Sequence, residues 1–102
     1  MGTEIRITGP VLKVLGTLSL SGVGELSGAD IARVTNLASG TLYPILFRLE
    51  RASWLESRWE VDDSRATRGP RRRFYRISAL GERSLKAAVD DLQQALGRLA
   101  WA

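Results

Sequence analysis

The chain has 102 residues, of which 44% are apolar and 25% charged, the length and composition of a single globular domain. It contains no cysteine and no histidine, which excludes disulfides, thiol catalysis, zinc sites of the Cys/His type and histidine-based catalytic pairs. No apolar run reaches the roughly 18–20 residues that cross a bilayer, and the N-terminal residues do not form a signal peptide, so we expect a cytoplasmic protein without a membrane partner. The carboxylate pairs Asp62-Asp63 and Asp90-Asp91 are sequence neighbours that point in different directions, so we expect no enzyme, no metal site and no cofactor.

Two helices are predicted in the first third of the chain. Pro10 suits the first turn of a helix over residues 10–20, which has one apolar face. Ser27 is expected to be the N-cap of a short helix over residues 28–36, because its hydroxyl can accept a bond from a free N–H of the first turn.

A third helix is predicted over residues 39–52, with Ser39 as its N-cap. The short turn before it gives the spacing of a helix-turn-helix, a pattern that many small helical domains share. If its polar face entered a DNA major groove, Arg48 and Arg51 would reach phosphates or guanine and Phe47 a thymine methyl. The alternative is an ordinary amphipathic helix whose Phe47 packs on a neighbour. The apolar residues expected to face inward are Leu42, Ile45, Leu46 and Leu49.

The formal charge of +4 is concentrated in one segment of the chain. Residues 1–60 and residues 77–102 are each neutral, so the whole excess lies in residues 61–76. The guanidinium fork suits phosphates and guanine edges, so this cluster favours a polyanionic partner, although a solvated loop can have the same composition. The arginines of the segment are Arg65, Arg68, Arg71, Arg72, Arg73 and Arg76.

After residue 52 the periodicity changes from 3.6 to 2, which predicts a β-hairpin. Residues 55–61 alternate as a half-buried strand, and residues 72–77 form a second strand. The connection between them contains Gly69-Pro70 and much of the arginine cluster. A basic hairpin directly after a helix-turn-helix is the order of a winged helix. We expect the wing to hold the flanking DNA backbone through Arg68, Arg71, Arg72 and Arg73.

Residues 78–100 have the pattern of a long helix, with Ser78 as its N-cap. Apolar residues recur at coiled-coil spacing, so we expect this helix to pair with that of a second copy, although it could instead fold back on its own core. The residues predicted for the dimer interface are Leu85, Val89, Leu92, Leu96 and Leu99. Trp101 follows this helix, and it either closes a slot for a small aromatic effector between two copies or is a frayed terminal residue.

Several of these segments resemble the PadR family of bacterial transcriptional regulators. The stretch Ser39-Gly40-Thr41-Leu42-Tyr43-Pro44-Ile45-Leu46, followed by Arg48-Leu49-Glu50, is similar to the recognition-helix signature of that family. The stretch from Pro70 to Ser78, with Gly81, is similar to its wing and to the start of its last helix. The resemblance implies a homodimeric winged-helix repressor, a phosphate hydrogen bond from Tyr43, and relief by small aromatic molecules in some relatives.

Three positions depart from the usual pattern of the family. Ser53 stands where a glycine commonly ends the recognition helix, and Ser27 stands where a tyrosine is frequent. In the wing, Arg68-Gly69 reverses the order that relatives usually have.

The sequence therefore predicts a mainly helical α+β fold, with a winged helix-turn-helix DNA-binding domain in residues 1–77 and a dimerisation helix in residues 78–102. The predicted function is sequence-specific binding of double-stranded DNA by a homodimeric repressor at an inverted-repeat operator. A winged helix for protein–protein contact and a ligand-responsive sensor are the alternatives. The first turn of the third helix would offer N–H groups to a phosphate. The residues predicted to contact DNA are Ser39, Gly40, Thr41, Tyr43, Phe47, Arg48, Arg51, Arg68, Arg71, Arg72 and Arg73.

Overall fold

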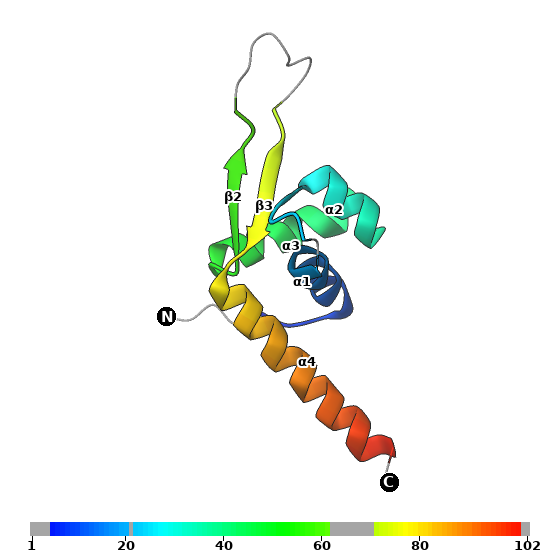
Figure 1. Cartoon of the computed structure of the whole chain (residues 1–102). Coiled ribbons are helices and arrows are strands. Elements are labelled where there is room, and N and C mark those ends of the chain that lie inside the picture. Colours follow the sequence, from blue (N-terminus) through cyan, green and yellow to red (C-terminus); the bar gives the residue numbers. More distant parts are fainter. Residues whose placement is uncertain (1–4, 21, 62–70, 101–102) are drawn as a thin grey trace.

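The computed structural model of the chain describes residues 5–20, 22–61 and 71–100. Within them, three helices gather at the base of a β-hairpin, and a fourth helix leaves this body in the direction away from the hairpin (Figure 1). The fold is mainly helical α+β, as predicted. The elements are α1 (Gly9–Leu20), β1 (Leu26–Ser27), α2 (Gly28–Thr35), α3 (Ser39–Arg51), β2 (Leu55–Trp59), β3 (Arg73–Ile77) and α4 (Ala79–Ala100).

The core lies between α1, α2, α3 and the base of the sheet. α1 and α3 each bury four apolar side chains at helical spacing, and the four of α3 are those that the sequence predicted to face inward. Among the described residues, the buried polar side chains of this core are those of Ser27 and Thr35. Both are hydrogen-bonded. The buried apolar residues are Val11, Val14, Leu15, Leu18, Ile31, Leu42, Ile45, Leu46, Leu49, Leu55 and Tyr75.

The sheet has three antiparallel strands in the order β1-β3-β2. β2 and β3 form the hairpin, in which Leu55 pairs with Ile77 and Trp59 pairs with Arg73. β1 adds only two residues, opposite Phe74 and Tyr75, and so ties the start of α2 to the hairpin. β1 was not predicted, because two residues are too few to establish a period of two.

The predicted half-buried strand over residues 55–61 is shorter and less buried than expected. β2 ends at Trp59, whose side chain is 51% exposed, and Val61 is more exposed still. Figure 1 shows that the hairpin extends past the helices, so no helix covers its outer part. Alternation of apolar and polar residues indicates a strand. It does not indicate whether another element covers the apolar side of that strand.

Two of the three predicted N-caps are confirmed and one is wrong. The Ser27 Oγ accepts a hydrogen bond from the Asp30 N–H, and the Ser78 Oγ accepts one from the Gly81 N–H at 3.0 Å. At α3 the N-cap is Ala38, which has no side chain for the role, and Ser39 is already the first helical residue. The turn is closed instead by the backbone, because the N–H groups of Thr41 and Leu42 both donate to the Ala38 carbonyl.

α3 ends in a left-handed residue although no glycine is present there. Ser53 has a φ of 64°, and the N–H of Trp54 donates to the Leu49 carbonyl at 2.9 Å. Glycine is the usual residue in this left-handed position at a helix end, so Ser53 adopts the conformation at a steric cost.

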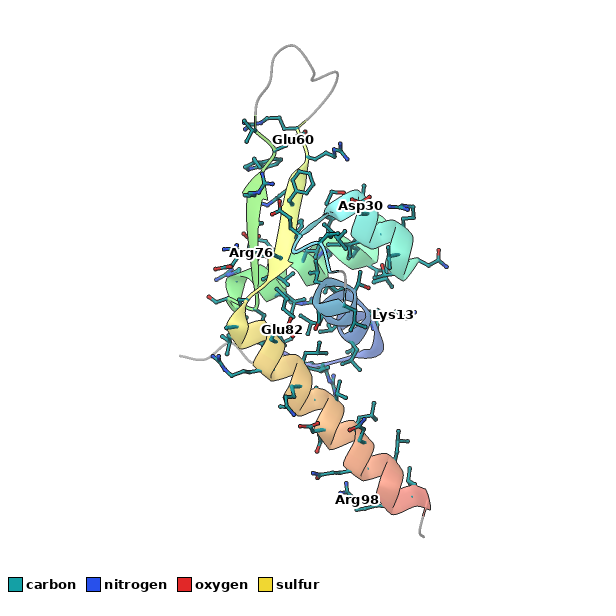
Figure 2. The ribbon with its side chains drawn as sticks, viewed as in Figure 1. Lys13, Asp30, Glu60, Arg76, Glu82 and Arg98 are labelled. Atoms are coloured by element: carbon teal, nitrogen blue, oxygen red, sulfur yellow. The ribbon has the colours of Figure 1, made fainter. Side chains whose placement is uncertain are left out.

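α4 is anchored to the body only at its first turns. The Ser78 hydroxyl bonds to the carbonyl oxygens of Ser53 and Trp54, and the Ser19 hydroxyl on α1 donates to Glu82 at 2.9 Å. Glu82 lies at this anchored end, whereas Arg98 lies near the far end (Figure 2). Leu85 is partly buried against the core, and the apolar residues beyond it are increasingly exposed. In the part of the chain that the structure describes, no helix combines the length and apolarity needed to cross a bilayer.

Candidate nucleic-acid interface

The predicted contact residues of α3 share one exposed face. Phe47 is 60% exposed, and Arg48 and Arg51 beside it are also exposed. The Arg51 guanidinium lies 5.7 Å from the centre of the Phe47 ring, which is within cation–π range. An aromatic ring and two guanidinium groups are therefore presented together on the side of the helix that faces away from the core.

The first turn of α3 is exposed as well. Ser39 and Gly40 precede Thr41, which is the first residue of α3 whose N–H bonds back to the turn. The leading N–H groups of a helix lack intrahelical partners, so they can donate hydrogen bonds to a phosphate oxygen.

The Tyr43 side chain of α3 lies close to the start of α2. A Cβ added at Gly28 would lie 2.8 Å from the Tyr43 hydroxyl, so this glycine is what lets the tyrosine ring approach the N-terminus of α2. Ser27 caps that N-terminus, and hydrogen bonds from Arg33 and Ser27 hold the pKa of the Asp30 carboxyl below its usual value. The Tyr43 side chain is half exposed, with its hydroxyl beside the helix N-terminus.

The arginines of the hairpin occupy different environments. Arg71 and Arg72 are exposed, at the point where the chain enters β3. The Arg72 guanidinium lies 3.8 Å from the Glu60 carboxylate, a loose ion pair, and Arg71 lies 5.8 Å from the centre of the Trp59 ring. Figure 2 shows Glu60 near the outer end of the described part of the hairpin. Arg68, also predicted to contact DNA, lies outside the described residues, as does Trp101.

Arg73 is bound within the protein. Its guanidinium lies 3.1 Å from the Glu50 carboxylate, and its Nε donates to the Ser57 hydroxyl at 3.0 Å. Ser57 in turn donates to Glu50, so the three side chains close a ring that joins the last turn of α3 to both strands of the hairpin. The same guanidinium lies 5.0 Å from the centre of the Trp59 ring. Arg73 was predicted only as a further phosphate contact, and this network was not predicted.

The signal that could have indicated the network is weak. Glu50 stands on the border between the buried and exposed faces of α3, where a carboxylate often has a partner. Ser57 and Arg73 both fall on the side of the hairpin that faces α3, because alternate residues of a strand share a face. Locating the partner nevertheless requires the strand register, which the sequence alone leaves open.

The opposite face of the hairpin also carries arginines, and these are paired. Arg58 bonds to Glu25, and this hydrogen bond holds the pKa of the Glu25 carboxyl below its usual value. Arg76 lies 2.9 Å from Glu56. The excess positive charge of the described hairpin therefore lies at its outer end, where Arg71 and Arg72 are exposed.

Comparison with known proteins assigns the chain to a family. Residues 25–87, more than half of the chain, match the sequence profile of the transcriptional regulator PadR-like family. The chain belongs to this family. The match begins just before β1 and extends into α4, so it covers α2, α3, the hairpin and the anchored end of α4. No curated protein matches the sequence significantly.

Solved structures of PadR-family proteins have the same fold. A PadR-like transcription factor from Bacteroides fragilis is 24% identical, with a TM-score of 0.68, and the match covers 87% of each chain. A PadR-family regulator from Eggerthella lenta is 26% identical, with a TM-score of 0.65, covering 88% of this chain and 80% of that one. Bacillus subtilis PadR in complex with operator DNA is 21% identical, with a TM-score of 0.64, covering 78% of this chain and 46% of that one.

The elements of this chain correspond to those of the PadR fold. α2 and α3 form the helix-turn-helix, and β2 and β3 form the wing, so the predicted winged helix-turn-helix is confirmed. The exposed face of α3 and the exposed arginines of the wing line one cleft, which contains Tyr43 and Phe47 from the helix and Arg71 and Arg72 from the wing.

Proposed function

We propose that this PadR-family protein is a repressor that binds double-stranded DNA sequence-specifically, as a homodimer on an inverted-repeat operator. The observation that carries the proposal is that Tyr43 and Phe47 of α3 and the exposed Arg71 and Arg72 of the wing line one cleft. Arg48 and Arg51 are exposed on the same helix. A helix and a basic hairpin on the same side can engage a groove and the adjoining backbone together. Bacillus subtilis PadR, which has this fold, was solved in complex with operator DNA, and this supports DNA binding by the present chain.

The roles divide between base contact and phosphate contact. α3 would enter the major groove, where Phe47, Arg48 and Arg51 read base edges. The phosphate contacts would come from the first turn of α3, from Tyr43, and from the wing. The residues in these phosphate roles are Ser39, Gly40, Thr41, Tyr43, Arg68, Arg71 and Arg72. Arg73 has a different role in this proposal, because its guanidinium is already held by Glu50 and Ser57.

The homodimer would form through α4. Val89, Leu92, Leu96 and Leu99 are exposed and recur at intervals of three and four residues, so they form one apolar stripe along the helix. Leu85 lies at the anchored end of this stripe and is partly buried against the core of its own protomer. Pairing two stripes about a twofold axis would present two α3 helices to half-sites about one helical turn apart. An effector slot at Trp101 remains a prediction.

The test is a titration of the protein against labelled duplex DNA at several salt concentrations. One duplex is taken from upstream of the protein's own gene, and the control is a scrambled duplex of the same composition. We expect a clear preference for the upstream duplex near physiological salt. If three wing arginines of each subunit contact phosphates, the logarithm of the affinity should fall with the logarithm of the salt concentration at a slope of about −5. Equal binding to both duplexes would contradict sequence-specific regulation at this promoter, and no binding to either would contradict the proposal as a whole.

A further inference from the structure

Arg73 is held by other side chains, whereas the arginines beside it are exposed. Its guanidinium lies 3.1 Å from the Glu50 carboxylate, and its Nε donates to the Ser57 hydroxyl at 3.0 Å. Arg71 and Arg72 line the same cleft as Arg73 and are exposed. In the described part of the wing, the wall of this cleft therefore combines accessible guanidinium groups with one that is restrained.

Glu50 is the ionic partner in this restraint. Its two carboxylate oxygens lie 3.1 and 3.4 Å from the same guanidinium nitrogen of Arg73, and one of them also accepts a hydrogen bond from Ser57. The centre of the Trp59 ring lies 5.0 Å from the guanidinium carbon. Glu50 and Arg73 both line the cleft, and each side chain is about one-third exposed. A phosphate in the cleft would therefore compete with Glu50 for the same guanidinium.

The ion pair Glu50–Arg73 joins α3 to the wing. Glu50 lies in the last turn of α3, and Arg73 is the first residue of β3. The other ion pairs of the described wing do not involve α3, since their carboxylates belong to the wing itself or to the residue before β1. These pairs are Arg58–Glu25, Arg72–Glu60 and Arg76–Glu56. Among the described charged side chains, Glu50 is therefore the one that links the position of the wing to that of α3.

Restraint of an arginine affects the affinity for DNA and the specificity differently. Contacts from arginine to phosphate do not depend on the base sequence and supply most of the non-specific affinity. A further free arginine in the cleft would thus raise the affinity for any duplex. An arginine bound to α3 adds no such contact, and it keeps the wing at a fixed distance from the helix proposed to read the bases. The wing then makes its phosphate contacts best where α3 has bound its own base sequence.

We propose that Glu50 is a specificity-determining positioning residue, which acts through Arg73 and does not itself contact DNA. Its carboxylate withholds the Arg73 guanidinium from the DNA backbone and fixes the wing relative to α3. It thereby lowers the affinity for unrelated DNA more than the affinity for the operator. This inference rests on the proposed function, because it concerns the discrimination between operator and other duplexes. The withholding of Arg73 from phosphate does not depend on that function.

The experiment compares the full chain with Glu50→Gln, which keeps the shape of the side chain and removes its charge. Each protein is titrated against the upstream duplex and the scrambled duplex at several salt concentrations. We expect Glu50→Gln to bind the scrambled duplex at least about threefold more tightly, with a log–log salt slope steeper by about two, one released arginine for each subunit of a dimer. The preference for the upstream duplex should fall at least about threefold. An unchanged slope or an unchanged preference would overturn the proposal.

Two matched controls separate the release of Arg73 from a change in net charge. Glu56→Gln removes the same charge from the wing, but its partner Arg76, at 2.9 Å, lies on the opposite face, so its slope should change by no more than a few tenths. The double variants Glu50→Gln/Arg73→Gln and Glu50→Gln/Arg76→Gln have equal net charge. The first should return to the slope of the unaltered protein, and the second should remain steep. Equal slopes in the two double variants, or a steeper slope in Glu56→Gln, would overturn the role of Arg73.

Inorganic polyphosphate, a phosphate polymer without bases, tests the withholding of Arg73 apart from the proposed function. Glu50→Gln should bind it at least about threefold more tightly than the unaltered protein, and Glu56→Gln should not. Thermal unfolding followed by circular dichroism establishes that each variant is folded. A stronger response of Glu50→Gln to polyphosphate, without duplex binding by any of the proteins, would support the withholding of Arg73 and contradict the proposed function. Preference for the upstream duplex, with equal polyphosphate binding by the three proteins, would do the reverse.

Discussion

Arg72 and Arg73 are neighbours in the chain but face different surroundings. Arg72 is exposed with a loose contact to Glu60, whereas Arg73 is held by Glu50 and Ser57. We expect Arg72→Gln to reduce the salt dependence of operator binding by about two in the log–log slope, one phosphate contact for each subunit of a dimer. Arg73→Gln should lower the affinity without changing that slope by more than a few tenths. Fluorescence anisotropy titrations at four salt concentrations measure both, with Arg76→Gln as the unchanged control.

The network around Glu50 should also be measurable as a coupling energy. In a double-mutant cycle, Glu50→Gln and Arg73→Gln should couple by about 0.5–1 kcal/mol in the free energy of unfolding, since both side chains are about one-third exposed and solvent weakens the pair. The reference is the more exposed pair Glu56–Arg76 in the same wing, for which a smaller coupling is expected. Urea unfolding gives the energies. A coupling at Glu50–Arg73 no larger than the reference value would show that the pair does not hold the wing to α3.

Ser53 has a conformation that glycine adopts at lower cost. Because its φ is 64°, Ser53→Gly should raise the free energy of unfolding by about 0.5–1 kcal/mol, after the larger chain entropy of the unfolded glycine variant is subtracted. The neighbouring Ala52 has an ordinary φ of −82°, so Ala52→Gly should be destabilising by a similar amount. Opposite signs at two adjacent positions, measured by urea unfolding, are the expected result. A destabilising Ser53→Gly would mean that the serine side chain has a compensating role.

At the scale of elements, periodicity was sufficient for the helices that pack on the core. The inward residues of α3 and the N-caps at Ser27 and Ser78 were predictable because they depend on spacing and on one hydroxyl. The exposure of Trp59 and Val61 was not predictable, because these residues alternate like buried ones and are nevertheless 51% and 78% exposed. Burial depends on a neighbouring element, and the pattern of one strand contains no information about it.

The same limit explains what was missed at the candidate site. The sequence indicated that α3 and the wing carry aromatic and basic residues, but the pairing of Arg73 with Glu50 needs the register of β2 against β3. A one-residue shift of that register would turn Arg73 to the other face of the wing. The arginine that is bound within the protein could therefore not be distinguished by sequence from those that are exposed.

The junction between the wing and α4 requires a glycine at position 81. A Cβ at Gly81 would lie 2.3 Å from the carbonyl oxygen of Trp54 and 2.8 Å from the Ile77 side chain. Gly81→Ala should therefore lower the free energy of unfolding by about 1–3 kcal/mol, as overpacking against the backbone does. Gly97 on the same helix has open space around it, so Gly97→Ala should be stabilising, by up to about 1 kcal/mol. Equal effects of the two substitutions on thermal unfolding would contradict a close contact at this junction.

At the scale of the whole molecule, the exposed stripe of α4 determines whether two protomers act together. Leu92 is exposed in the protomer, so Leu92→Lys should leave the winged helix folded and abolish pairing. Operator affinity should fall at least about 100-fold, because the second half-site is no longer bound intramolecularly. Sedimentation and anisotropy measure the two effects. The control is Gln94→Lys, an exposed position off the stripe, which should remain as associated as the unaltered protein.

The narrow attachment of α4 makes this helix a lever arm. With 22 residues it is about 33 Å long, so a tilt of about 10° at its base moves its far end by about 6 Å, which is close to two base-pair steps of about 3.4 Å each. In a dimer joined along the far half of α4, a tilt at the base of this helix would change the distance between the two α3 helices. The Ser78 hydroxyl and the Gly81 contact would thus set the number of base pairs between half-sites, at a distance from any nucleotide.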